Sequence, residues 1–186
     1  MALCRVEPAV GCVSGCESAR NCSSCESSHR GHLLVSGAAF DEPEFIVPVG
    51  KRPASGVVVL EPDGRVWAVS PSNQFGGYEA TFAKVTLSWK DGLSIRANGL
   101  KEAYEEAGLK IELTGFLVDV TRSTSFTRYY VGRRLGGSPA DMGWESQAVH
   151  LVPHQELPAV VAHTNDAPIL EALSAYLARL EQASPG

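Results

Sequence analysis

The stretch that decides the fold is Lys101-Glu102-Ala103-Tyr104-Glu105-Glu106-Ala107-Gly108-Leu109. A helix turns by about 100° per residue, so Glu102 and Glu106 lie one above the other, and Glu105 joins the same face. Like charges at this spacing repel each other unless a cation lies between them, and hard divalent cations prefer oxygen ligands. The stretch therefore predicts a helix with an acidic face that can hold a divalent metal ion.

The residues on either side of this stretch indicate where the helix begins and ends. Ser94 is a suitable N-cap, because its hydroxyl can accept a bond from a free backbone N–H. Gly108 stands where a helix commonly ends in a left-handed residue, with Leu109 as the apolar contact after it. Residues 110–117 then alternate as a strand does. The predicted order is loop, acidic helix, tight turn and strand.

These residues resemble the Nudix box, the signature of the Nudix hydrolases. The box reads glycine, five residues, glutamate, seven residues, then Arg-Glu-hydrophobic-x-Glu-Glu-x-Gly-hydrophobic. Residues 101–109 match its second half, except that Lys101 stands for the arginine. The glycine and the first glutamate of the box project onto Leu87 and Leu93. The loop before the helix is also longer than the family pattern, so the resemblance is strongest in the second half of the box.

Strand patterns on both sides of the helix indicate an α/β fold. Before it, residues 57–60 and 66–69 form an expected hairpin around the turn at residues 62–64. After it, we expect strands at residues 111–120, 126–135 and 147–153. A last helix opens near Asp166 and carries an apolar stripe formed by Ile169, Leu173, Tyr176, Leu177 and Leu180. The resemblance implies a Nudix-type α/β/α sandwich with a mixed β-sheet, over residues 41–186.

Nudix enzymes hydrolyse a phosphoanhydride bond in a nucleoside diphosphate derivative, and the resemblance carries this activity over as an expectation. It implies Mg²⁺ or Mn²⁺ held by Glu102, Glu105 and Glu106, with Glu105 also catalytic and Lys101 orienting the carboxylates. ADP-ribose and dinucleoside polyphosphates are typical of the expected small-molecule substrates. For the general base, Glu145 on a later loop is the candidate, with a box glutamate, His150 and His154 as alternatives.

Three further side chains suit contacts with a nucleotide. Arg128 and Tyr130 lie on one face of their expected strand, with Tyr129 and Val131 on the other. Arginine pairs with phosphate, and aromatic rings stack on bases, so Arg128, Tyr130 and Trp144 are the predicted substrate-binding residues.

The departures from the box leave a second function class open. Leu93 removes a carboxylate that often helps to position metal or water, and a lysine cannot reproduce the planar fork of an arginine. The alternative is a Nudix-fold domain that binds nucleotides or a partner but hydrolyses weakly or not at all. Release of product from a panel of nucleotides in the presence of magnesium discriminates the two.

Composition restricts the partners. The 186 residues contain 16 basic and 21 acidic side chains, a formal net charge of −5, which does not favour a nucleic-acid partner. No apolar run reaches the roughly 18 residues that a membrane-spanning helix needs, and the N-terminus lacks the pattern of a signal peptide. We therefore expect a cytoplasmic protein that needs no membrane, and a homodimer is left open.

The five cysteines all lie within the first 25 residues: Cys4, Cys12, Cys16, Cys22 and Cys25. One interpretation is a small zinc site. Only Cys22 and Cys25 have the spacing of a ligand pair, however, and their polar surroundings are typical of a disordered tail. This weak spacing favours a disordered extension over residues 1–40, so that a chain starting near Glu42 should keep its stability.

Overall fold

The computed structural model describes residues 39–88 and 92–183. The cysteine-rich segment lies outside these residues, so the expectations of a disordered extension and of a zinc site stay predictions. The elements in chain order are β1 (Arg52–Leu60), β2 (Arg65–Pro71), a 3-10 helix (Ser72–Gly77), β3 (Lys84–Thr86), α2 (Ile95–Ala107), β4 (Leu109–Thr121), β5 (Ser125–Gly137), a 3-10 helix (Pro139–Asp141), β6 (Ser146–Pro153), α3 (Leu157–Val160), a 3-10 helix (Thr164–Asp166) and α4 (Ala167–Ala183).

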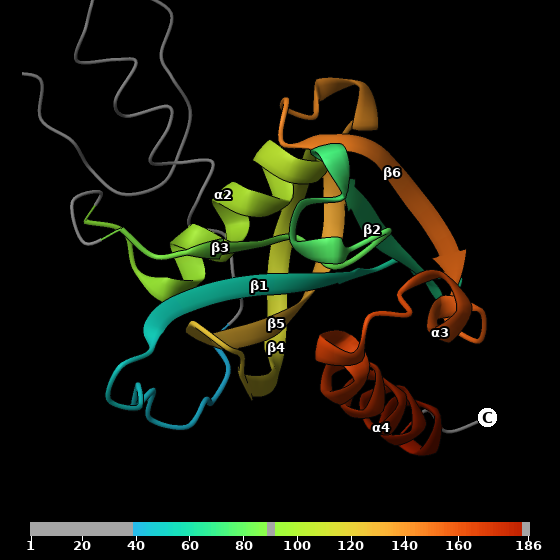
Figure 1. The fold of residues 1–186 in the computed structure, drawn as a ribbon. Coiled ribbons are helices and arrows are strands. Elements are labelled where there is room, and N and C mark those ends of the chain that lie inside the picture. Colours follow the sequence, from blue (N-terminus) through green and yellow to red (C-terminus); the bar gives the residue numbers. More distant parts are fainter. Residues whose placement is uncertain (1–38, 89–91, 184–186) are drawn as a thin grey trace, which may run out of the picture.

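A six-stranded mixed sheet forms the centre of the domain (Figure 1). Its order is β4-β5-β1-β2-β6, and β3 pairs with β1 off this path. β1 and β5 run parallel, whereas the other pairs are antiparallel. The first half of β1 pairs with β3, and its last residues pair with β2. Two strands therefore pair with the same edge of β1, one after the other.

Helices cover both faces of the sheet (Figure 1). On one face, Leu100 and Ala103 of α2 pack against Val57 and Val59 of β1. On the other, Ile169 and other residues of α4 pack with α3 against the opposite side of the same strands. The predicted α/β/α sandwich with a mixed sheet is confirmed.

The ends of α2 follow the rules that the sequence suggested. Ser94 caps the N-terminus by accepting a 3.2 Å hydrogen bond from the N–H of Ala97. Gly108 ends the helix at φ 70°, and its N–H donates to the carbonyl oxygens of Ala103 and Tyr104. A β-carbon at Gly108 would lie 2.0 Å from a backbone oxygen of Ser138. Both the positive φ and this close contact therefore favour glycine at the position. This sharp end leads directly into β4 and fixes the direction of the acidic face.

Three features differ from the sequence-based expectations. β3 was not predicted, because three residues are too few to show a strand period. The expected strands are longer, and β1 begins at Arg52 rather than residue 57. The apolar stripe of α4 ends before Leu180, whose relative exposure is 43%, since the helix extends beyond the sheet at this end.

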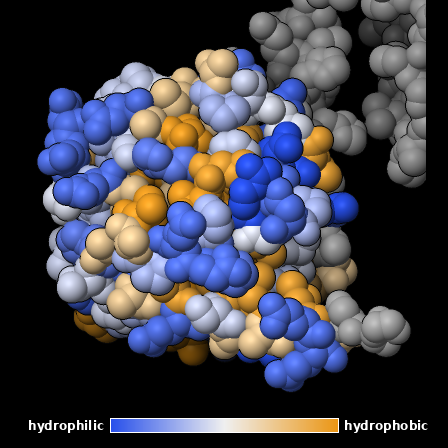
Figure 2. Space-filling view, turned by 90° about the vertical axis from the view of Figure 1, so that its right-hand side faces the viewer, coloured by the Kyte–Doolittle hydropathy of each residue, from blue (hydrophilic) through white to orange (hydrophobic). Residues whose placement is uncertain are grey.

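The surface near β6, α3 and α4 has hydrophobic and hydrophilic residues interspersed (Figure 2), the usual mixture on a protein surface. Within the described ranges, no helix is long and apolar enough to cross a membrane.

Candidate metal and substrate site

Two helical glutamates and one loop glutamate meet beside the C-terminal half of α2. Glu102 and Glu106 come from adjacent turns of the helix, and Glu145 comes from the loop before β6. Each offers a carboxylate oxygen, and these oxygens all lie within 4.8 Å of one another. The cluster therefore joins two expected metal ligands, Glu102 and Glu106, with the expected general base, Glu145.

Hydrogen bonds from Ser72 hold the loop that carries Glu145. The backbone N–H of Ser72 donates to the carbonyl oxygen of Glu145 at 2.8 Å, and its hydroxyl donates to the carbonyl oxygen of Trp144 at 2.6 Å. Ser72 begins the 3-10 helix in which Asn73 and Gln74 adopt left-handed φ values of 57° and 50°. Backbone conformations of this kind cost free energy and are common at functional sites.

Burial, full for Glu102 and partial for Glu106, changes the protonation of the two helical carboxyls. Glu102 is only 2% exposed. Burial raises the pKa of Glu102 to about 8, and the neighbouring Glu106 carboxylate adds to the rise. Burial also raises the pKa of Glu106 to about 7, against the opposing effect of Lys84 and its backbone N–H, which donates to Glu106 Oε2 at 3.1 Å. Without a cation, part of this cluster is protonated at neutral pH.

Glu105 lies outside the cluster. It is exposed, and its Oε2 accepts a 2.6 Å hydrogen bond from the ammonium of Lys101. The same ammonium lies 3.7 Å from Glu102 Oε1. Lys101 thus lies near two of the box carboxylates, and the orienting role that the resemblance implies for it stays a prediction.

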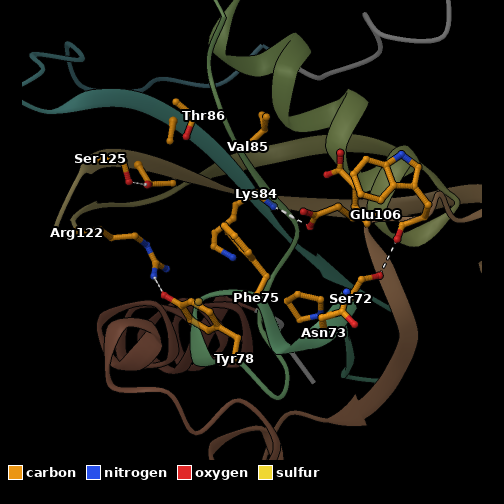
Figure 3. Close-up of a pocket in the computed structure, with 16 residues that line it drawn as sticks. Ser72, Asn73, Phe75, Tyr78, Lys84, Val85, Thr86, Glu106, Arg122 and Ser125 are labelled. Carbon is orange, nitrogen blue, oxygen red and sulfur yellow. Dashed lines mark hydrogen bonds between the residues drawn. The ribbon is translucent and has the colours of Figure 1, made fainter.

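A pocket of about 630 Å³ opens beside Glu106 and Glu145. Its wall runs from these glutamates past Lys84 to Tyr78 and Arg122 (Figure 3). Phe75 and Trp144 also line the pocket, with relative exposures of 82% and 84%. Exposed aromatic side chains beside a pocket are suited to stacking on a planar ligand group. His150 instead contacts Ser70 and is not among the lining residues.

Arg128 and Tyr130, predicted to bind substrate, do not line this pocket. They do share one face of β5, as the alternation predicted, but that face meets the segment before β1. Arg128 is 2% exposed and forms a double hydrogen bond with Asp119 at 2.8 and 2.7 Å. Its Nη1 and the Tyr130 hydroxyl also donate to Glu42 Oε2. Their donors make hydrogen bonds within the protein, and a contact of either side chain with substrate stays a prediction.

A buried network on the other side of the pocket was missed from the sequence. Arg122 and Asp166 form a 2.6 Å ion pair, with side chains 7% and 0% exposed. Arg122 also donates to the hydroxyls of Tyr78 and Tyr129, and Asp166 accepts a bond from Thr81. No local pattern signals this network, because its members come from separate parts of the chain. The one available hint was Asp166 just before an expected helix, which was interpreted only as the helix start.

Comparisons with known proteins point to one fold. No protein-family model and no curated protein matches the sequence. A NUDIX hydrolase from Nitrosomonas europaea matches at 14% identity and a TM-score of 0.58, covering 69% of this chain and 89% of that one. An ADP-ribose pyrophosphatase from Streptococcus suis matches at 19% identity and 0.51, covering 65% and 90%. A Caenorhabditis elegans Ap4A hydrolase matches at 15% and 0.53, covering 67% and 98%.

These identities are low, so the likeness shows how the chain folds and leaves its reaction to be argued from the residues. The acidic helix, the tight turn at Gly108 and the mixed sheet between two helical layers agree with what residues 101–109 predict. The resemblance is therefore confirmed at the level of architecture: the chain has the fold of the Nudix hydrolases.

Proposed function

We propose that the domain is a metal-dependent hydrolase of a phosphoanhydride bond in a nucleoside diphosphate derivative. The observation that carries this proposal is the cluster of Glu102, Glu106 and Glu145, whose carboxylate oxygens lie within 4.8 Å of one another at the edge of a nucleotide-sized pocket. Glu106 and Glu145 also line that pocket, so a bound phosphate group would lie next to the cluster.

The donor set fits Mg²⁺ or Mn²⁺. All three residues offer oxygen, the ligand atom that hard divalent cations prefer. Burial of Glu102 and Glu106 makes their mutual repulsion costly, and a divalent cation offsets it. When bound there, a divalent cation supplies charge neutralisation for phosphate oxygens and activation of water. Our proposed ligands are thus Glu102, Glu106 and Glu145, with Glu105 beside them on the exposed side.

The other side chains orient the substrate and handle the proton. Water that attacks phosphorus must lose a proton to a base. Glu145, the exposed member of the cluster, and Glu105, next to Glu106, are the proposed acceptors. Trp144 and Phe75 offer exposed rings for a base at the pocket opening. Lys101 holds Glu105 and lies near Glu102, which keeps the helical carboxylates oriented.

A binding domain without hydrolysis is the second candidate, and a specific observation favours it. Leu87, at the position of the box glycine, is buried and donates its N–H to Pro53 at 2.9 Å. This position therefore serves packing against β1. Leu93 offers no carboxylate in place of the first glutamate of the box.

Hydrolysis of a nucleotide panel with magnesium tests the proposal. The panel should contain ADP-ribose, dinucleoside polyphosphates and nucleoside triphosphates, with product release followed by chromatography. We expect turnover of at least one compound that is abolished by EDTA and lowered at least tenfold by Glu106→Gln. Glu171→Gln, at an exposed position on α4, is the matched control and should retain the rate. Nucleotide binding without any metal-dependent turnover would reject the hydrolase in favour of the binding domain.

A further inference from the structure

The pocket wall away from the glutamates is rich in hydrogen-bond donors. Figure 3 shows Arg122 and Ser125 on one side of the pocket, Glu106 on the other, and Lys84 between them. Thr127 lines the same region from β5. We call the side chains of Lys84, Arg122, Ser125 and Thr127 the cationic wall. The proposed metal site uses only the clustered glutamates and gives the cationic wall no function.

Lys84 has few close partners for its ammonium group, although the more distant carboxylates of Glu106 and Asp166 favour its charged form. Its ammonium can donate three hydrogen bonds, yet the structure gives it one, a long 3.5 Å contact to Thr81 Oγ1. Its Nζ also lies 4.7 Å from the centroid of the Tyr78 ring. Among the described residues, no carboxylate oxygen lies within the 4.0 Å of an ion pair. An anionic oxygen in the pocket would supply the missing acceptor.

The neighbouring groups also have donors to spare. Arg122 pairs with Asp166 through Nη2, and its Nε has no hydrogen-bond partner among the described residues, but that atom is itself buried. Ser125 Oγ and Thr127 Oγ1 share one 3.3 Å hydrogen bond, so only one of their two hydroxyl protons is used in it. Ser125 and Thr127 both line the pocket. The wall thus has one ammonium without an ion-pair partner among the described residues, and two hydroxyls that share a single hydrogen bond.

We propose that the cationic wall binds an anionic group of the substrate that is separate from the diphosphate held at the glutamates. The inference rests on the proposed function, because it assigns the two ends of one pocket to two parts of one substrate. Asp166 forms its close ion pair with Arg122, and Lys84 has no carboxylate at ion-pair distance among the described residues, so its ammonium can still pair with an anionic oxygen of the ligand. A neutral sugar would leave that charge unpaired, whereas a further phosphate would pair with it. The favoured substrate class is therefore a nucleoside polyphosphate with more than two phosphates.

Relative catalytic efficiency tests this assignment. We would measure kcat/KM for diadenosine tetraphosphate and for ADP-ribose with the full-length protein and three variants. The wild type should favour the tetraphosphate by roughly tenfold or more, the effect of one charge-assisted contact. Lys84→Met should bring the ratio close to one, and Lys84→Arg should restore most of the preference. Lys110→Met, at an exposed position on β4, should keep the wild-type ratio. A ratio between two substrates does not change when only the amount of folded enzyme changes.

Binding of inorganic tripolyphosphate in EDTA separates this inference from the proposed hydrolysis. Without a divalent cation, the glutamates repel the anion, so calorimetry reports the cationic wall alone. We expect binding that Lys84→Met weakens by roughly tenfold and that neither Glu106→Gln nor Lys110→Met weakens. If no substrate is hydrolysed but this pattern holds, the hydrolase proposal fails and the anion subsite stands. A preference for ADP-ribose, or tripolyphosphate binding that ignores Lys84, would overturn the subsite.

Discussion

The backbone N–H of Gly143 donates a 2.6 Å hydrogen bond to the carbonyl oxygen of Glu105. This bond satisfies one of the last carbonyls of α2 and ties the end of the helix to the loop that carries Glu145. Residue 143 has little room, because an added β-carbon would lie 2.9 Å from the same oxygen. The absence of a side chain at Gly143 therefore allows Glu145 to meet the helical glutamates.

Gly143→Ala should loosen the candidate metal site with little effect on the fold. The added methyl pushes the loop from the helix, so Glu145 moves away from Glu102 and Glu106. We expect Mn²⁺ affinity, measured by calorimetry, to fall by roughly tenfold, because metal sites tolerate small displacements poorly. Gly115→Ala is the control, since a β-carbon there meets no atom within 4 Å. Equal affinities in the two variants would mean that Glu145 is no ligand.

Charge removal at Glu105 and at Glu106 should have unequal effects on metal binding. Glu106→Gln removes a member of the cluster, whereas Glu105→Gln removes an exposed partner of Lys101. Mn²⁺ affinity should fall at least tenfold in the first variant and by less than about threefold in the second. Calorimetric titration of both variants side by side gives the comparison. Similar losses would favour the ligand set that the sequence resemblance implied, with Glu105 as a full ligand.

Stability should depend on pH in opposite directions with and without metal. The pKa values of Glu102 and Glu106 rise from 4.5 to about 8 and about 7, so the folded chain binds protons more tightly than the unfolded chain. Metal-free stability therefore falls as the pH rises from about 4.5 towards 8, by up to about 1.4 kcal/mol per pH unit for each group. A bound divalent cation requires both carboxylates deprotonated, so its affinity rises over the same range.

Differential scanning calorimetry at several pH values checks this. The increase in Tm that saturating Mg²⁺ produces should grow steadily from about pH 6 to about pH 8. In Glu106→Gln the growth should be smaller, because one titrating group is gone. A magnesium effect that is constant over this range would show that the two carboxyls do not titrate there.

The local parts of the fold were predictable from the sequence, because their causes are local. Ser94 and Gly108 define the two ends of α2, each through hydrogen bonds to backbone groups within a few residues of itself. The alternation in β5 placed Arg128 and Tyr130 on the same face. Rules of this kind act between neighbours in the chain, so a single sequence displays them.

The partners of these residues were not predictable, because they come from distant segments. Arg128 and Tyr130 bind Glu42, which precedes them by 86 and 88 positions. Arg122 meets Asp166 across 44 positions. The approach of Glu145 to the helical glutamates likewise depends on how a loop is held. Periodicity describes which way a side chain points but carries no information about what it meets there, so the ligand set stays a prediction.

The segment before β1 should contribute to stability through Glu42. Its carboxylate accepts hydrogen bonds from Arg96 at 2.7 Å, Arg128 at 3.2 Å and Tyr130 at 2.9 Å. Phe40 packs on the Arg96 guanidinium, 3.8 Å from the ring centroid. A chain that starts at residue 42 loses Phe40, and one that starts at residue 48 loses both contacts. The sequence-based expectation that a chain starting near Glu42 keeps its stability stays a prediction, and Phe40 is the contact that such a chain would lose.

Urea unfolding of Glu42→Gln measures the contribution of the carboxylate. The amide keeps one acceptor oxygen but loses the charge, so Arg96 and Arg128 lose their strongest interaction with this segment. We expect the free energy of unfolding to fall by about 1.5–3 kcal/mol, the range for hydrogen bonds to charged groups. Glu44→Gln, two residues further along at an exposed position, should change it by less than about 0.5 kcal/mol. If the two variants unfold at the same urea concentration, the segment adds no stability through the Glu42 carboxylate. That carboxylate would then give no reason to prefer a chain that starts at residue 42 over one that starts at residue 48.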